Sequence, residues 1–172
     1  DSLIVSSRET SAIIKVKGLH SQPELDWLAG DGRFWQDTPY AGLCLTQVGD
    51  FVPQYGQHCV EYLADGEEDG VYYLAVYNNN YWSLNSRDFT LEVADSVGTG
   101  LYLTDDETSQ VYIYRIDEND RTFALEDSFD VPYSSIVSNG SQCGDQGNWV
   151  VNSGVAMVFG EYDADGELIR EY

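Results

Sequence analysis

The residues closest to a known metal-binding pattern lie in the last segment of the chain, EYDADGELIREY (residues 161–172). Asp163, Asp165 and Gly166 follow the spacing of an EF-hand calcium loop, in which alternate carboxylates and a central glycine surround the ion. The twelfth position of that loop must supply a bidentate glutamate, but Tyr172 occupies it. An Asp-Gly pair between two strand-like segments is also typical of a tight hairpin turn. We therefore expect a β-hairpin here, with Asp163 and Asp165 kept as candidate ligands of a looser calcium site.

A second acidic turn, ADGEEDG, contributes three more candidate calcium ligands: Asp65, Glu67 and Asp69. Calcium binds about six to eight oxygen atoms, so two such turns would have to meet in the folded chain. Each turn taken alone is more typical of a solvated loop. We expect that no cofactor is required and that calcium is an optional ligand.

Motifs of the common enzyme classes are missing from the sequence. It has no nucleophile elbow, phosphate-binding loop, dinucleotide fingerprint or HExxH zinc motif. Cys143 lies in the glycine-rich segment GSQCGDQGNW, but a papain-like nucleophile needs a histidine downstream, and His20 and His58 both precede it. We therefore assign no catalytic residue. A hydrolase that uses two carboxylates remains an alternative, because acids are abundant and their separation is spatial.

Aromatic residues gather in two polar segments, DWLAGDGRFWQDTPY and the turn YNNNYW. Flat rings beside Asp, Asn and Gln can stack on sugar rings, while the polar neighbours bond to hydroxyl groups. The alternative is a long loop that packs on its own rings, as an Ω-loop does. The candidate ligand-binding residues are Trp27, Phe34, Trp35, Tyr40, Tyr81 and Trp82.

The charge of the chain excludes two classes of partner. Asp and Glu number 30 against 8 Lys and Arg, which gives a formal net charge of −22. A protein that binds nucleic acid or anionic lipid needs a basic patch, so we expect neither partner. No apolar run is long enough to span a bilayer, so we expect no membrane insertion. The acids are spread along the chain, which favours a highly soluble surface.

The cysteines point to an oxidising compartment. Cys44 and Cys59 both lie in strand-like segments, and a disulfide between them would stabilise the fold by about 3 kcal/mol in the chain-entropy model. Such a bond suits a secreted, periplasmic or cell-surface protein.

The hydrophobic pattern is almost entirely that of β-strands. In residues 111–116, Val111, Ile113 and Arg115 share one face and the alternate residues share the other. Such runs, separated by turn-forming segments, predict about ten to twelve short strands in an antiparallel β-sandwich or open barrel. A capping-box pattern at Ser21 and Glu24 predicts one short helix near residues 22–29. We expect a single β domain over residues 1–172.

These observations favour a non-catalytic extracellular or periplasmic binding module. Its expected ligand is a glycan or a similar surface ligand, with optional help from calcium. The first alternative is an envelope or surface subunit that works through assembly or protein interaction, such as a pilus, adhesin, accessory or inhibitor protein. The second is the carboxylate-dependent hydrolase.

Overall fold

The computed structural model describes residues 1–81 and 107–172, and these residues form an all-β protein. Their secondary structure is 12 strands and three short 3-10 helices, with no α-helix in either described range. The expected fold class and strand number are therefore confirmed. The strands are β1 (Ser2–Ser7), β2 (Ala12–Lys17), β3 (Glu24–Gly30), β4 (Thr46–Val48), β5 (His58–Asp65), β6 (Val71–Asn78), β7 (Thr108–Asp117), β8 (Thr122–Pro132), β9 (Ser138–Cys143), β10 (Asn148–Ser153), β11 (Val158–Tyr162) and β12 (Leu168–Glu171).

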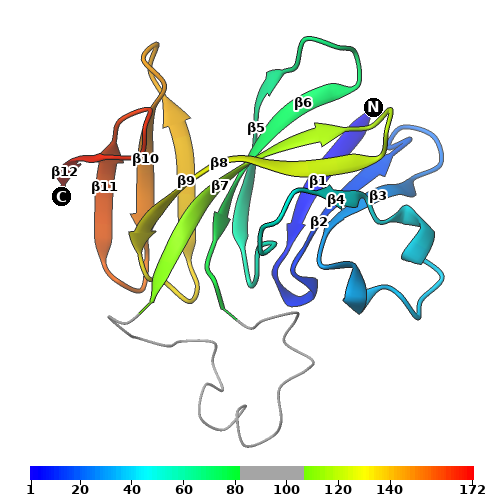
Figure 1. The fold of residues 1–172 in the computed structure, drawn as a ribbon, viewed down its shortest axis with the longest axis horizontal. Helices are drawn as coiled ribbons and strands as arrows, with labels where there is room; N and C mark the ends of the chain where they lie inside the picture. Colours follow the sequence, from blue (N-terminus) through cyan, green and yellow to red (C-terminus); the bar gives the residue numbers. More distant parts are fainter. Residues whose placement is uncertain (82–106) are drawn as a thin grey trace, which may run out of the picture.

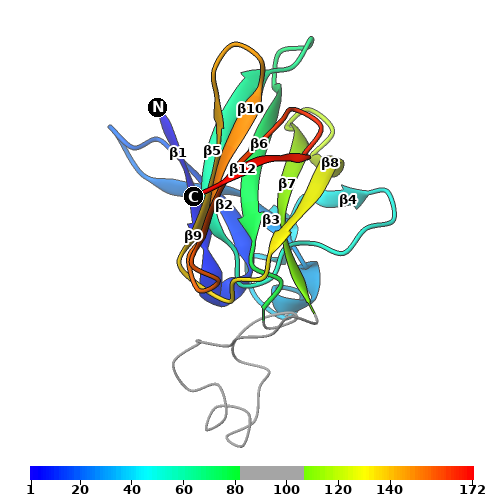
Figure 2. The ribbon, with the colours of Figure 1, turned by 90° about the vertical axis from the view of Figure 1, so that its left-hand side faces the viewer.

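The strands form three sheets that stand side by side (Figure 1). The first sheet has the order β1-β2-β3, the central sheet β4-β8-β7-β6-β5, and the third sheet β12-β11-β10-β9. Neighbouring strands are antiparallel except β4, which runs parallel to β8. Each sheet is thus built mainly from consecutive strands, and the three follow one another along the chain. In Figure 2 the third sheet faces the viewer, with the other two sheets behind it. The expected all-β class is thus realised as three sheets.

The central sheet is covered on both faces, and β6 shows this most clearly. Tyr72, Leu74 and Val76 belong to a core shared with the first sheet, which we name the first core. Ala75 and Tyr77 belong to a core shared with the third sheet, the second core. A strand buried on both faces has a nearly continuous apolar sequence, which explains the run GVYYLAVY.

The alternation expected in β7 is confirmed by the same two cores. Val111 and Ile113 pack in or against the second core, whereas Tyr112, Tyr114 and Ile116 pack in or against the first. Side chains of β7 therefore alternate between the first core and the second core.

The helix expected near residues 22–29 is wrong, because β3 occupies most of that segment. Trp27, Leu28 and Ala29 are each only 1% exposed. Ile13 of β2 pairs with Ala29, and Lys15 pairs with Trp27. A capping box has a local effect of about 1 kcal/mol, and burial of three consecutive side chains in a sheet outweighs it.

The disulfide expected between Cys44 and Cys59 is also wrong, because both residues are free cysteines. Cys44 forms an isolated bridge with Leu28 of the first sheet. The Cys59 Sγ atom instead faces the third sheet, 3.5 Å from Asn139 Oδ1. The two thiols therefore belong to different sides of the central sheet. Burial raises the pKa of both thiols.

Within the described ranges, no helix has the length and apolar character needed to cross a membrane.

Candidate functional site

A hydrogen-bonded polar cluster lies where β5 begins, β6 ends and β9 begins. His58 Nδ1 is 2.8 Å from Asn79 Oδ1. The Asn79 side-chain amide donates to the Ser134 carbonyl oxygen at 2.6 Å and contacts Ser138 Oγ at 3.2 Å. We call these four residues the His58 cluster. They join the start of β5 and the end of β6 in the central sheet to the start of β9 in the third sheet.

The bonds of Asn79 determine the tautomer of His58. The amide nitrogen of Asn79 faces a carbonyl oxygen, so the amide must be oriented with its oxygen toward the imidazole. An amide oxygen only accepts hydrogen bonds, so the neutral imidazole carries its proton on Nδ1. Nε2 then keeps its lone pair and can act as a base or a nucleophile.

Backbone strain is concentrated around this cluster. Cys59, Asn80 and Val137 have φ angles of 51°, 52° and 59°, and each is next in sequence to a cluster residue. The left-handed region is costly for most residues and especially for a β-branched one such as Val137. Conformations of this kind persist where the surrounding structure enforces them, and they are frequent at functional sites.

A β-bulge at Cys59 directs the His58 side chain. His58 pairs with Tyr77, whereas Val60 already pairs with Val76, so Cys59 is an inserted residue. His58 therefore lies on the second-core face, with Tyr77, while Val60 lies on the first-core face. Bulges often reorient a side chain beside an active site.

Glu61 lies near His58 on the same face of β5. It pairs with Ala75, two residues from the His58 partner Tyr77, so the two positions are about 7 Å apart along the sheet. Its Oε2 atom is buried and has no hydrogen-bond partner among the described residues. A buried carboxylate oxygen without a donor is well suited to accept a proton or a hydrogen bond from a ligand.

The connector before β5 fixes the position of His58. Residues 53–57 (PQYGQ) are all buried. The Gln57 side chain donates to the carbonyl oxygens of Ser7 and Ala12, each at 3.1 Å. Gln54 donates to the carbonyl oxygen of Ala29 at 3.1 Å and accepts from the Tyr114 hydroxyl at 2.7 Å. The first sheet and the central sheet are therefore both anchored to the segment that ends at His58.

Arg8, in the 3-10 helix η1 (Arg8–Thr10), brings a positive charge to the same end of the molecule. Its guanidinium carbon is 5.8 Å from the centre of the Tyr81 ring. Tyr81 lies against the connector, since a Cβ atom on Gly56 would be 2.4 Å from the Tyr81 carbonyl oxygen. Arg8 also pairs with Glu9 at 2.6 Å. This end of the molecule thus carries an imidazole, a carboxylate and a guanidinium that is paired with Glu9.

A family model described as arylsulfotransferase (ASST) matches residues 1–171. The chain belongs to the arylsulfotransferase family. No significant match is found among curated proteins. The family consists of enzymes, so the expectation of a non-catalytic binding module is wrong, and so is the expectation of carbohydrate binding.

The aromatic residues that the sequence predicted as ligand contacts have different environments in this arylsulfotransferase-family chain. Trp27 lies in the first core, where its indole nitrogen donates to Glu118 Oε1 at 2.8 Å. Tyr81 is only 6% exposed. Phe34, Trp35 and Tyr40 pack edge to face on one another, with ring centres 4.7 and 6.3 Å apart along this series. These three rings pack together within one loop, and Trp82 lies outside the described residues.

The acidic turns chosen as candidate calcium ligands have two different environments. Asp163 Oδ1 accepts hydrogen bonds from the backbone nitrogens of Asp165 and Glu167, and the turn closes the β11–β12 hairpin, as expected. Asp65, Glu67 and Asp69 lie instead beside a cavity at the far end of β5. Among residues 1–81 and 107–172, no group of three or more His, Cys, Asp and Glu is placed to hold a metal ion. The calcium expectation is not supported.

The sequence did not single out His58 because its partners are distant along the chain. Part of the information needed to locate His58 was in the sequence, since the pattern of residues 58–65 and 71–78 is typical of two neighbouring strands. A hairpin register would have placed His58 near the Asn78–Asn80 triplet. The bulge at Cys59 and the contact with Ser134 require the folded structure.

Proposed function

We propose that this chain transfers a sulfuryl group between aryl hydroxyl groups, with His58 as the nucleophile. The family name supports the reaction class, because it denotes transfer of a sulfuryl group involving an aryl compound. The observation that carries the residue assignment is the bond from His58 Nδ1 to Asn79 Oδ1, which leaves Nε2 with its lone pair.

The first step forms a bond between His58 Nε2 and the sulfur atom of an aryl sulfate. The sulfur–oxygen bond to the aryl group breaks, and its electron pair leaves on the phenolate oxygen, which takes a proton from water. The ring then carries positive charge, and Asn79 Oδ1 stabilises the Nδ1–H group that faces it.

The second step returns the enzyme to its starting state. The hydroxyl oxygen of an acceptor phenol attacks sulfur, the nitrogen–sulfur bond breaks, and the electron pair returns to Nε2. Glu61 takes the proton of the acceptor, since its Oε2 atom is buried without a donor among the described residues, and then releases this proton to the hydroxide ion left by the first step. Arg8 supplies the positive charge that favours the sulfuryl oxygens at this end of the molecule.

We further propose that the protein works outside the cytoplasm. Enzymes of this family are periplasmic in general, and this supports the compartment expected from the sequence.

The proposal is tested with 4-nitrophenyl sulfate as donor and phenol as acceptor. The wild-type protein should release 4-nitrophenol and form phenyl sulfate in equal amounts. His58→Ala should lower this rate by about 100-fold or more, because the nucleophile is lost. His20→Ala is the matched control, since the His20 side chain is 89% exposed.

A radiolabel experiment separates the nucleophile from a merely structural role. Incubation with a ³⁵S-labelled donor and no acceptor should label the wild type and the His20→Ala variant, but not His58→Ala or His58→Gln. All variants are compared only if their melting temperatures match. Full transfer activity in a folded His58→Ala protein would overturn the assignment, and no turnover by the wild type with aryl sulfates would overturn the proposed function.

A further inference from the structure

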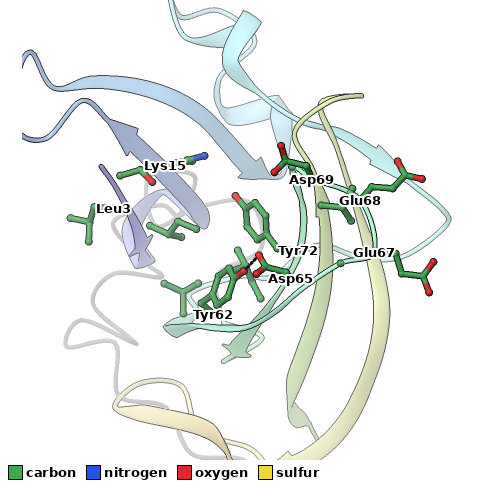
Figure 3. A pocket seen from close by; sticks show the side chains of 15 residues that line it. Leu3, Lys15, Tyr62, Asp65, Glu67, Glu68, Asp69 and Tyr72 are labelled. Carbon is green, nitrogen blue, oxygen red and sulfur yellow. Dashed lines mark hydrogen bonds between the residues drawn. The ribbon is translucent and has the colours of Figure 1, made fainter.

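A cavity of about 670 Å³ opens between the first sheet and the central sheet. It is lined by the first residues of β1, by Lys15 of β2, by the end of β5, by the turn at residues 66–70 and by the start of β6 (Figure 3). Its volume is within the range typical of small-molecule sites. Asp65 is seven residues from His58 in β5, or about 23 Å in an extended strand, so this is a second location.

One wall of the cavity is apolar and aromatic. Leu3, Val60 and Leu74 contribute aliphatic groups. The Tyr62 ring is 51% exposed and lies against the Tyr72 ring, with ring centres 5.6 Å apart and planes inclined by 33°. An exposed ring held in place by a buried one offers a flat surface on which a ligand can stack.

Lys15, the one cation among the described residues that line the cavity, is already engaged. Lys15 Nζ is hydrogen-bonded to Glu118 and lies 3.5 Å from Asp26 Oδ2. Glu118 Oε1 also accepts bonds from the Tyr72 hydroxyl at 2.6 Å and from Trp27. Burial would raise the pKa of Glu118, but the bonds from Lys15, Tyr72 and Trp27 outweigh it and hold this pKa below its usual value. Glu118 therefore stays charged, and its negative charge balances the positive charge of Lys15.

Four carboxylates lie on the rim, on Asp65, Glu67, Glu68 and Asp69, and Asp65 Oδ1 accepts a hydrogen bond from the Tyr62 hydroxyl. Figure 3 shows Glu67 and Glu68 extending away from the cavity, whereas Asp65 and Asp69 lie on the side of Tyr62 and Tyr72. This charge excludes an aryl sulfate and favours a positively charged ligand.

The acidic turn is held in one shape before any ligand arrives. The Gly66 amide donates to the Val71 carbonyl oxygen at 2.7 Å, and the Val71 amide donates to the Glu68 carbonyl oxygen at 3.1 Å. The Asn119 side chain donates to the Asp69 carbonyl oxygen at 2.8 Å. A rim fixed in this way loses little conformational entropy on binding.

We infer that this cavity binds a compact organic cation, namely a protonated amine joined to an aromatic ring. The ring stacks on Tyr62 against the aliphatic wall, and the ammonium group meets Asp65 and Asp69. The inference rests on the cavity, its aromatic wall and its charge, and it is independent of the proposed sulfuryl transfer.

Calorimetric titration with three ligands of one skeleton tests the inference. 2-Phenylethylamine is cationic, 2-phenylethanol is neutral and phenylacetate is anionic. The amine should bind about 10-fold more tightly than the alcohol, and phenylacetate should not bind. Equal affinity for the amine and the alcohol, or binding of phenylacetate, would overturn the inference.

Variants separate this site from general attraction of cations to an acidic protein. Asp69→Asn and Tyr62→Ala should each weaken amine binding by about 5-fold or more. Asp145→Asn removes the same charge from an exposed turn and should leave the affinity unchanged. An equal loss in Asp145→Asn and Asp69→Asn would contradict a specific site. His58→Ala should bind the amine with the wild-type affinity. Amine binding can therefore be tested whether or not the protein transfers sulfuryl groups.

Discussion

The single residue Asn79 sets the chemical state of His58 without itself reaching the reacting atoms. Its amide bonds to Ser134 and Ser138 keep its oxygen toward the imidazole. We therefore regard Asn79 as a positioning residue. Its counterpart in other catalytic groups is the side chain that fixes a histidine tautomer.

Replacement of Asn79 by alanine should lower kcat for sulfuryl transfer by about 10- to 100-fold, with little change in KM. The reason is that the imidazole loses the acceptor that keeps the proton on Nδ1, while the substrate contacts persist. Steady-state kinetics with 4-nitrophenyl sulfate measures both constants. Asn80→Gly is the control, because glycine tolerates the φ angle of 52° at this position. A rise in KM with unchanged kcat would show that Asn79 acts in substrate binding instead.

The sequence predicted residue faces well where one strand alternates regularly, and poorly where a bulge or a distant partner intervenes. Tyr112 and Tyr114 were assigned to one face, and both pack at the first core. Cys59 was placed in a strand-like segment, but its φ angle of 51° breaks the regularity of that strand next to His58. A bulge has no distinctive sequence here, so the orientation of His58 depended on the fold.

At the scale of elements, Glu118 connects strands that belong to different sheets. Lys15 of β2 and Trp27 of β3 reach it from the first sheet, and Tyr72 of β6 reaches it from the central sheet. Burial and the negative charge of Glu118 raise the pKa of the Tyr72 phenol well above its usual value, so Tyr72 stays a hydrogen-bond donor. The bond from Trp27 to Glu118 adds to the burial and the pairing with β2 that hold residues 24–30 as a strand.

Glu118→Gln should destabilise the protein by about 1 kcal/mol at neutral pH, after allowance for solvent screening, which lowers the melting temperature by about 2–4 °C. The folded pKa of Glu118 is lowered, so its stabilisation is complete above the ordinary Glu pKa of about 4.3 and is lost as the pH falls through the folded value. The gap between wild type and variant should therefore close toward low pH. Thermal melts across pH 3–8 measure it, with the exposed Glu167→Gln as control. A gap independent of pH would contradict this linkage.

At the scale of the whole molecule, the fold is a row of three sheets whose two interfaces have different uses. The first interface carries the half-buried Glu118 network and the acidic cavity. The second carries the His58 cluster at the ends of its strands. The hydrophobic pattern predicted the all-β class, but two facing sheets and three sheets in a row bury alternating strands equally well. Only the doubly buried run in residues 71–78 distinguished the central sheet.

The net charge of −22 should also govern how the proposed substrate reaches the protein. An aryl sulfate is an anion, so the field of the protein repels it, and dissolved salt screens that repulsion. We expect kcat/KM for 4-nitrophenyl sulfate to rise by about 2- to 10-fold between 20 and 500 mM NaCl, while the KM of a neutral phenol acceptor changes little. Melting temperatures at each salt concentration distinguish this effect from a gain in folded protein. The affinity of the acidic cavity for 2-phenylethylamine should respond in the opposite direction and fall with salt, because salt weakens the attraction of the ammonium group to the acidic rim. A fall in kcat/KM with salt would mean that local cations such as Arg8 dominate the field at the site, despite the charge of the whole molecule.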